Sequence, residues 1–214
     1  MGGGTSAIAN RGRDGNFPLP QRIYYYEPAV NDDAQLIEDT LAGHSAAFGK
    51  LVQKYQDRLY NTVAHVAGNA EDARDVVQDA FVQAFLKLDT FKGSSAFYTW
   101  LYRIAFNVAA THRRRKRSTV SLERVRETSG NEPMGNEETP SEILERKERC
   151  RQVRQAINQL NEEHRAVVVL REIDGCCYET IAEILGLPVG TVRSRLHRAR
   201  LQLREQLKEV LVGE

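Results

Sequence analysis

The sequence predicts an all-α protein with two small helical domains joined by a flexible linker. Apolar residues recur every three to four positions along two long stretches, 32–117 and 143–214, which is the spacing of amphipathic helices. Between them, residues 118–142 are mainly Ser, Thr, Gly, Asn and Glu, with two prolines and only four bulky apolar residues, as linkers are. Near the C-terminus, residues 178–200 have the pattern of two short helices joined by a tight turn.

The composition fits a chain with modest cores and an uneven distribution of charge. The 214 residues are 41% hydrophobic, and the formal net charge is only +1. This small net charge includes two strongly basic segments. The run His112-Arg-Arg-Arg-Lys-Arg117 is one, and the segment 188–204, with five arginines and no acid, is the other. Basic clusters of this kind are typical of nucleic-acid binding.

The three cysteines, Cys150, Cys176 and Cys177, are an odd number without metal-ligand spacing. Adjacent cysteines rarely form a disulfide with each other, so a reduced cytoplasmic protein without metal or cofactor is expected. The Cys176-Cys177 pair fits either a redox switch or simple packing, and packing is favoured. No apolar run is long enough to span a membrane. Residues 1–31, rich in Gly, Asn, Pro and Arg, are predicted to be a disordered extension rather than a signal peptide.

The first domain is predicted to contain four helices. Residues from Asp33 suit two amphipathic helices broken near Gly43, and a third helix follows Gly68-Asn69. A short loop, 90–95, leads to a fourth helix that begins near Ala96 and runs into the basic segment. The apolar stripe of this fourth helix is Phe97, Trp100 or Leu101, Ile104, Ala105 and Val108.

The opposite face of the fourth helix combines aromatic, guanidinium and amide groups. Its members are Tyr98, Tyr102, Arg103, Phe106, Asn107, Arg113 and Arg114. Aromatic rings can stack on unpaired bases, guanidinium groups can hold phosphates, and Asn can read a base edge. Each stacked base contributes about 1–3 kcal/mol, so a few contacts could stabilise a short open stretch of duplex. The other interpretation is that most of these aromatic side chains belong to the core.

The second domain ends in a predicted helix-turn-helix. Gly186 can supply the left-handed C-cap of its first helix, Pro188 follows the stop, and Thr191 is a plausible N-cap for the second helix. The apolar stripe of the second helix is Val192, Leu196, Ala199 and Leu203. Off this stripe lie Arg193, Ser194, His197 and Arg198. A helix of this kind enters the DNA major groove, although a helical hairpin with a solvated basic face has the same pattern.

Two longer stretches resemble a known family. Residues 75–85 and 91–107 closely resemble domain 2 of the bacterial extracytoplasmic-function sigma factors, the compact members of the sigma-70 family. Residues 160–175, with the helix-turn-helix, resemble their domain 4. The resemblance covers about 33–117 and 142–210, in the same order. It implies a factor that binds core RNA polymerase, directs it to promoters with −10 and −35 elements and promotes DNA melting. It also implies an association with the nucleoid when polymerase is bound, and an anti-sigma factor as a partner.

The resemblance also implies which residues make these contacts. Domain 2 would bind the clamp coiled coil of the β′ subunit through Asp75, Gln78, Asp79 and Gln83. It would recognise and melt the −10 element through Lys92, Ser94, Ser95, Tyr98, Trp100, Arg103, Asn107, Arg113 and Arg114. Domain 4 would dock on the β-flap and read −35 bases through Arg193, Ser194, His197 and Arg198. Arg195 and Arg200 would instead contact phosphates or contribute to packing.

The chain departs from the family pattern at three places. The pair Gly43-His44 stands where the family often has Gly-Asp, and Gly93-Ser94-Ser95 stands where it usually has Gly-Asp-Ser. The first helix of the helix-turn-helix usually begins with Ser and carries Glu three residues later. Here Cys177 and Thr180 occupy those positions. This poorer cap costs on the order of 1 kcal/mol.

The length of the linker predicts that polymerase is needed for binding to both elements. A spacer of about 16–17 base pairs separates them by on the order of 55 Å. The 25 residues of 118–142 reach at most about 80–90 Å when extended, but average only about 25–30 Å as a free coil. The isolated chain is therefore expected to bind promoters weakly.

Two other classes of protein fit the sequence less well. An operator-binding helix-turn-helix regulator with a helical sensor domain explains residues 178–200 but leaves the Tyr98–Asn107 face without a purpose. An enzyme is not expected, because the five histidines are scattered and no Cys-His, Ser-His or paired-carboxylate spacing stands out.

Overall fold

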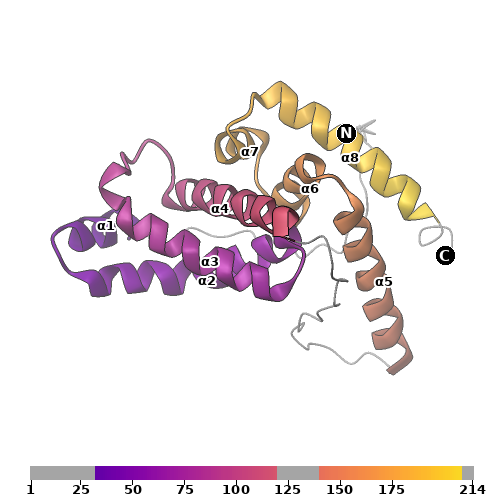
Figure 1. Ribbon diagram of the computed structural model, residues 1–214, viewed down its shortest axis with the longest axis horizontal. Coiled ribbons are helices and arrows are strands. Elements are labelled where there is room, and N and C mark those ends of the chain that lie inside the picture. The colour runs from indigo at the N-terminus through magenta and orange to yellow at the C-terminus, as the bar shows by residue number, and fades with distance from the viewer. Residues whose placement is uncertain (1–31, 120–139, 209–214) are drawn as a thin grey trace, which may run out of the picture.

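The computed structural model describes residues 32–119 and 140–208, and this part of the chain contains helices and no strand (Figure 1). The predicted all-α fold class is confirmed. The helices form an N-terminal bundle, α1–α4, and a C-terminal bundle, α5–α8. None of the helices in the described ranges is both long and apolar enough to cross a membrane. The predicted extension 1–31 lies outside the described residues.

The N-terminal bundle consists of α1 (Asp33–Leu41), α2 (Ser45–Ala67), α3 (Ala70–Leu86), a short 3₁₀ turn η1 (Leu88–Thr90) and α4 (Phe97–Thr119). Gly68 ends α2 in the left-handed conformation, at φ 95°. Asn69 then caps α3, because its side-chain oxygen accepts the backbone N–H of Asp72 at 2.7 Å. The predicted sequence of four helices is therefore confirmed. Their shared core includes Leu51, Leu59, Val63, Val76, Ala80, Ala84, Leu101 and Ala105.

The C-terminal bundle consists of α5 (Pro140–Gln159), α6 (Glu162–Val168), a π-helical turn η2 (Val169–Ile173), α7 (Tyr178–Leu185) and α8 (Val189–Gln206). Gly186 is left-handed, at φ 64° and ψ 40°, and ends α7 as predicted. The prediction that Thr191 caps α8 is wrong. The carbonyl of Pro188 accepts the N–H groups of Thr191 and Val192 at 2.9 and 3.1 Å, so the helix begins before Thr191.

The two bundles pack against each other. Helix α7 lies along α4, and η2 and α5 contact α2 (Figure 1). The buried apolar residues of both bundles form one continuous cluster. Helix also enters both ends of the expected linker 118–142, since α4 continues to Thr119 and α5 begins at Pro140. The rest of that segment lies outside the described residues.

Candidate nucleic-acid interface

The outer face of α8 carries the side chains predicted to read −35 bases. Val192, Leu196 and Ala199 are buried, which turns the opposite face of the helix outward. Arg193, Ser194, His197 and Arg198 are all exposed on that outer face. A helix of 18 residues presenting two arginines, a histidine and a hydroxyl in this way has the donors and acceptors that read base edges in a major groove.

The other two arginines of the predicted −35 set are held against the C-terminal bundle by salt bridges. Arg195 contacts the Glu163 carboxylate at 2.9 Å, and Arg200 contacts the Glu172 carboxylate at 2.6 and 3.0 Å. Both arginines are partly buried. They tie α8 to α6 and η2, which favours the packing role over a phosphate contact.

Tyr178 is a member of this surface that the sequence did not reveal. Its ring lies under two guanidinium groups, that of Arg171 at 5.2 Å and that of Arg193 at 5.8 Å from the ring centroid. Such cation–π contacts hold a long side chain in place. Tyr178 at the start of α7 thus positions Arg193 at the start of α8. The sequence feature that could have identified Tyr178 was its aromatic side chain at the first position of the helix-turn-helix.

The residues of α4 predicted to contact the −10 element differ in exposure. Arg103, Asn107 and Arg114 are exposed. Tyr98, Trp100 and Arg113 are partly buried. Trp100 packs on Phe91 and Phe97, with ring centroids 5.3 and 5.8 Å apart, at the base of the adjoining loop. In that loop Lys92 and Ser94 are exposed and Ser95 is half-buried.

Two aromatic residues assigned to the open face of α4 are not exposed. Tyr102 is completely buried and Phe106 is 8% exposed. The prediction that these two lie on an open face is therefore wrong, and the core interpretation holds for them: both belong to the buried apolar cluster. The Tyr102 hydroxyl also contacts Asp174 of the C-terminal bundle. Arg113 is also engaged across the bundles, where it donates to Glu162 at 2.8 Å.

The centre of the contact between the bundles is the carboxylate of Asp174, in the loop after η2. Its side chain is only 3% exposed. Arg58 of α2 approaches both carboxylate oxygens, Nε at 3.0 Å and Nη2 at 3.1 Å. The Tyr102 hydroxyl donates to it at 3.1 Å, and the hydroxyl of Thr62 lies at 3.2 Å. The Cys176 thiol lies 3.2 Å from the same group.

These contacts shift the pKa of the groups around Asp174. Burial lowers the pKa of Arg58, but its hydrogen bonds to Asp174 and the charge of that carboxylate outweigh burial and raise it above the ordinary value. Burial, and then the charge of Asp174, raise the pKa of Tyr102 and of the Cys176 thiol. All three groups therefore keep their protons at neutral pH. Sequence reasoning missed this cluster, because nothing in the segment that follows the apolar run 166–170 distinguishes Asp174 from a solvated acid.

The polar face predicted to bind polymerase borders an apolar groove. Asp75, Gln78 and Asp79 on α3 are exposed, and Gln83 is half-buried. Asp79 also contacts His112 Nε2 at 2.8 Å. Beside them, α2 and α3 form a groove of about 680 Å³. Its apolar lining is Phe48, Val52, Tyr60, Val77, Phe81, Val82, Phe85 and Leu86. Apolar residues this exposed, with Leu86 at 71%, were not predicted and are typical of a protein-binding surface.

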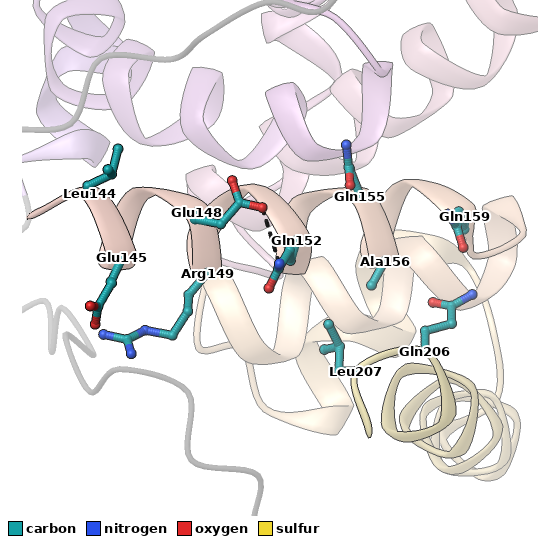
Figure 2. A pocket seen from close by; sticks show the side chains of 10 residues that line it. All are labelled: Leu144, Glu145, Glu148, Arg149, Gln152, Gln155, Ala156, Gln159, Gln206 and Leu207. Atoms are coloured by element: carbon teal, nitrogen blue, oxygen red, sulfur yellow. Dashed lines mark hydrogen bonds between the residues drawn. The ribbon is translucent and has the colours of Figure 1, made fainter. Parts of the chain in front are cut away.

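A second groove, of about 700 Å³, lies between α5 and the C-terminal end of α8. Figure 2 shows that its side chains are mostly charged or amide groups, with Glu148 and Gln152 hydrogen-bonded at 3.1 Å. Leu144, Ala156 and Leu207 are its apolar members. This groove is more polar than the one on the N-terminal bundle.

Comparisons with known proteins agree on one family. The family model for sigma-70 region 2 matches residues 51–119, and the model for sigma-70 region 4 matches residues 150–203. The RNA polymerase sigma-H factor of Pseudomonas aeruginosa is 41% identical over 184 residues, which cover 84% of this chain and 95% of the relative. The ECF RNA polymerase sigma-E factor of Escherichia coli strain K12 is 39% identical over 173 residues, covering 78% and 90%.

Two solved structures are similar over most of the chain. CnrH in complex with the cytosolic domain of CnrY has a TM-score of 0.62 at 28% identity, covering 84% of this chain and 99% of that one. RpoE in complex with the anti-sigma factor NepR from Bartonella quintana has a TM-score of 0.60 at 27% identity, covering 75% and 96%.

Proposed function

The chain belongs to the extracytoplasmic-function group of the sigma-70 family, whose members direct RNA polymerase to promoters, and we propose that its two bundles divide this task. The N-terminal bundle, within residues 32–117, acts as domain 2: it binds core polymerase and recognises and melts the −10 element. The C-terminal bundle, within 143–214, acts as domain 4 and reads the −35 element. The observation that carries this division is the outward face of α8, where four side chains suited to bases are exposed while the neighbouring arginines form salt bridges within the bundle.

Arg193 and Arg198 are the main −35 readers in this proposal. Arginine can donate two parallel hydrogen bonds to guanine, and each such pair contributes about 1–3 kcal/mol of discrimination. Ser194 and His197, whose side chains are shorter, add further base contacts on the same face. Arg195 and Arg200 act indirectly, because their salt bridges to α6 and η2 fix the angle at which α8 leaves the bundle.

The −10 contacts in this proposal come from the loop after η1 and from α4. Lys92, Ser94 and Ser95 line the loop that holds a flipped base. Arg103 and Asn107, both exposed on α4, then supply a phosphate contact and a base-edge contact. Tyr98, Trp100, Arg113 and Arg114 complete this surface. None of these steps needs a cofactor, a metal or a catalytic group, so the protein acts as a non-catalytic subunit.

The α2–α3 groove and the polar face beside it form the proposed polymerase-docking surface. A helix of the β′ clamp coiled coil fits an apolar groove that is lined by Phe85, Leu86 and Gln78 among others. Asp75 and Asp79 are exposed on the same helix, α3, and add acidic groups to the docking surface. The C-terminal bundle docks on the β-flap. Both solved neighbours are complexes with a second protein, one of them named as an anti-sigma factor, and we extend such a partner to this chain. The site of action is the cytoplasm, at the nucleoid when polymerase is bound.

Run-off transcription with purified core polymerase and genomic promoter fragments tests the proposal. The chain is expected to start transcription at defined sites, and R198A to reduce it about tenfold or more on the same templates. E205A, which removes an exposed charge at the end of α8, is the matched control and leaves transcription unchanged. Tight operator binding by the free chain, with no transcript when core polymerase is added, would instead support the regulator.

A further inference from the structure

The contact between the bundles contains a complete anion-binding site. Arg58, Thr62 and Tyr102 come from two helices of the N-terminal bundle and converge on one point, forming a cradle. The carboxylate of Asp174 from the C-terminal bundle occupies the cradle and is 3% exposed. Arg58 binds it as a fork, with Nε to one oxygen at 3.0 Å and Nη2 to the other at 3.1 Å. This is the geometry with which arginine binds carboxylates and phosphates alike.

The cradle lies within the surface proposed for the −10 element. Tyr102 precedes the exposed Arg103 on α4, and the ring of Tyr98 packs edge-on against that of Tyr102, with centroids 5.9 Å apart. The guanidinium of Arg58 lies over the ring of Tyr98, 5.2 Å from its centroid. The Thr62 and Tyr102 hydroxyls lie 3.3 Å apart and both face Asp174. A ligand bound along α4 therefore passes the cradle.

Separation of the bundles leaves this site without its anion. Arg58, whose side chain is 33% exposed while the bundles are packed, would then lose the carboxylate that both of its nitrogens contact. The Tyr102 hydroxyl would lose its acceptor too, and Thr62 would keep only its bonds within the N-terminal bundle. A partly buried charge is unfavourable without a partner, so the emptied cradle favours an anion. When single-stranded DNA lies along α4, a backbone phosphate is the anion available, and its two non-bridging oxygens suit the fork of Arg58.

We propose that the cradle is a phosphate site for the single-stranded −10 segment of promoter DNA, and that Asp174 holds the place of the phosphate while the bundles are packed. The inference rests on the proposed role of α4 in binding the −10 element. It makes packing of the bundles and binding of the melted strand mutually exclusive, because one carboxylate and one phosphate cannot share the cradle. Asp174 is thus a built-in competitor of DNA.

Fluorescence anisotropy with the full chain tests this competition. The probe is a labelled single strand spanning the −10 segment of a promoter mapped by run-off transcription, and binding is measured over a range of salt concentrations. D174A removes the competitor and is expected to bind the strand about fivefold or more tightly than the wild-type chain. D174N, which keeps the shape of the side chain, should shift in the same direction. E205A changes the net charge equally, away from the bundle contact, and should leave the affinity unchanged.

A second substitution in the D174A background separates a phosphate contact from simple opening of the chain. R58A/D174A is expected to bind about tenfold more weakly than D174A, and the slope of log affinity against log salt should fall by about 0.7, the value for one phosphate on a single strand. Y102F/D174A loses the hydroxyl but no charge. It should weaken binding without changing that slope.

The two levels of the proposal fail in different ways. If D174A binds the strand tightly and R58A/D174A matches it in affinity and salt slope, Asp174 is only a tether and the phosphate site is overturned. If neither the wild-type chain nor D174A prefers the −10 strand over a scrambled strand, the −10 role of α4 fails, and the phosphate site fails with it. Far-ultraviolet circular dichroism of each variant confirms that it is folded before binding is interpreted.

Discussion

At the scale of single residues, the two adjacent cysteines have opposite environments. Cys177 is exposed at the N-cap of α7, in an extended conformation, and its side chain makes no hydrogen bond to the helix backbone. Cys176 is buried against Asp174. The sequence correctly indicated a poor cap at Cys177, because the residue type alone decides whether an N-cap can accept a backbone N–H. It could not tell which cysteine is covered.

Replacing Cys177 with serine should stabilise the protein. A serine hydroxyl at this position can accept the backbone N–H of Thr180, which the sulfur of Cys177 does not do. We expect C177S to raise the free energy of unfolding by about 1 kcal/mol, measured by urea denaturation. The exposed substitution S194A is a control for a hydroxyl that does not cap a helix. An unchanged midpoint for C177S would show that the cap is not the weak point of α7.

Thiol labelling should separate the two cysteines. Burial and the charge of Asp174 raise the pKa of Cys176, which keeps it protonated, and it is inaccessible as well. In the native chain, a disulfide reagent such as Ellman's should label Cys177 within minutes and Cys176 only after unfolding. C177S should lose the rapid labelling of this pair. Rapid labelling of Cys176 would revive the redox interpretation and contradict simple packing.

His65 should make stability depend on pH. Burial, and then the charge of Arg154, lower its pKa to about 4, below the ordinary value of 6.5. Between these values the unfolded chain binds the proton and the folded chain does not, so the free energy of unfolding falls as pH drops from 6.5 towards 4. At pH 5 the loss relative to pH 7 is about 1–2 kcal/mol. H65Q should reduce this loss in parallel urea titrations, and an equal loss in both chains would exclude His65 as the cause.

At the scale of elements, apolar spacing and glycine residues predicted where the helices lie. They did not predict the residue at which α8 begins. Gly68 and Gly186 end α2 and α7 as expected, because only a residue that tolerates positive φ can do so cheaply. Thr191 is a good capping type, yet Pro188 begins α8 instead. The backbone geometry of the turn before α8, and not the capping preference of a side chain, decides where this helix begins. That geometry cannot be read from the sequence.

The arginines of α8 should divide into two functional groups. R198A is expected to lower affinity for a −35 duplex by about 1–3 kcal/mol with unchanged stability, since the side chain is exposed. R200A should instead lower the free energy of unfolding, by up to about 1 kcal/mol, because Glu172 loses its partner. Anisotropy and urea denaturation measure the two effects. A larger loss of DNA affinity in R200A than in R198A would reverse the assignment.

At the scale of the whole molecule, the contact between the bundles was beyond the reach of sequence. Periodicity states which residues of α4 share a face, and it grouped Tyr102 and Phe106 with Arg103 and Asn107. It cannot state that Asp174, more than 70 positions later, will cover part of that face. The apolar groove beside Asp79 was missed for the same reason, since exposure depends on which helices lie above a residue. The α8 face was predictable because one short segment forms it.

The packed arrangement predicts that the free chain gains little from a −10 element. We expect it to bind a full promoter duplex and a duplex carrying only the −35 element with affinities that agree within about twofold, because part of the −10 surface is covered. Adding core polymerase should create a strong preference for the full promoter. Anisotropy with the two duplexes measures both. A tenfold preference of the free chain for the full promoter would contradict this.

The packing of Asp174 into the N-terminal bundle has a consequence for how promoters compete. A chain that is open for only about one part in a hundred binds the melted −10 strand of every promoter with an apparent affinity about a hundredfold weaker than its intrinsic affinity, whatever the DNA sequence. The ratio between strong and weak promoters is unaffected. The stability of the closed form therefore sets how strongly the −10 strands of all promoters are bound. The exposed faces of α4 and α8 set the order of affinity among those promoters.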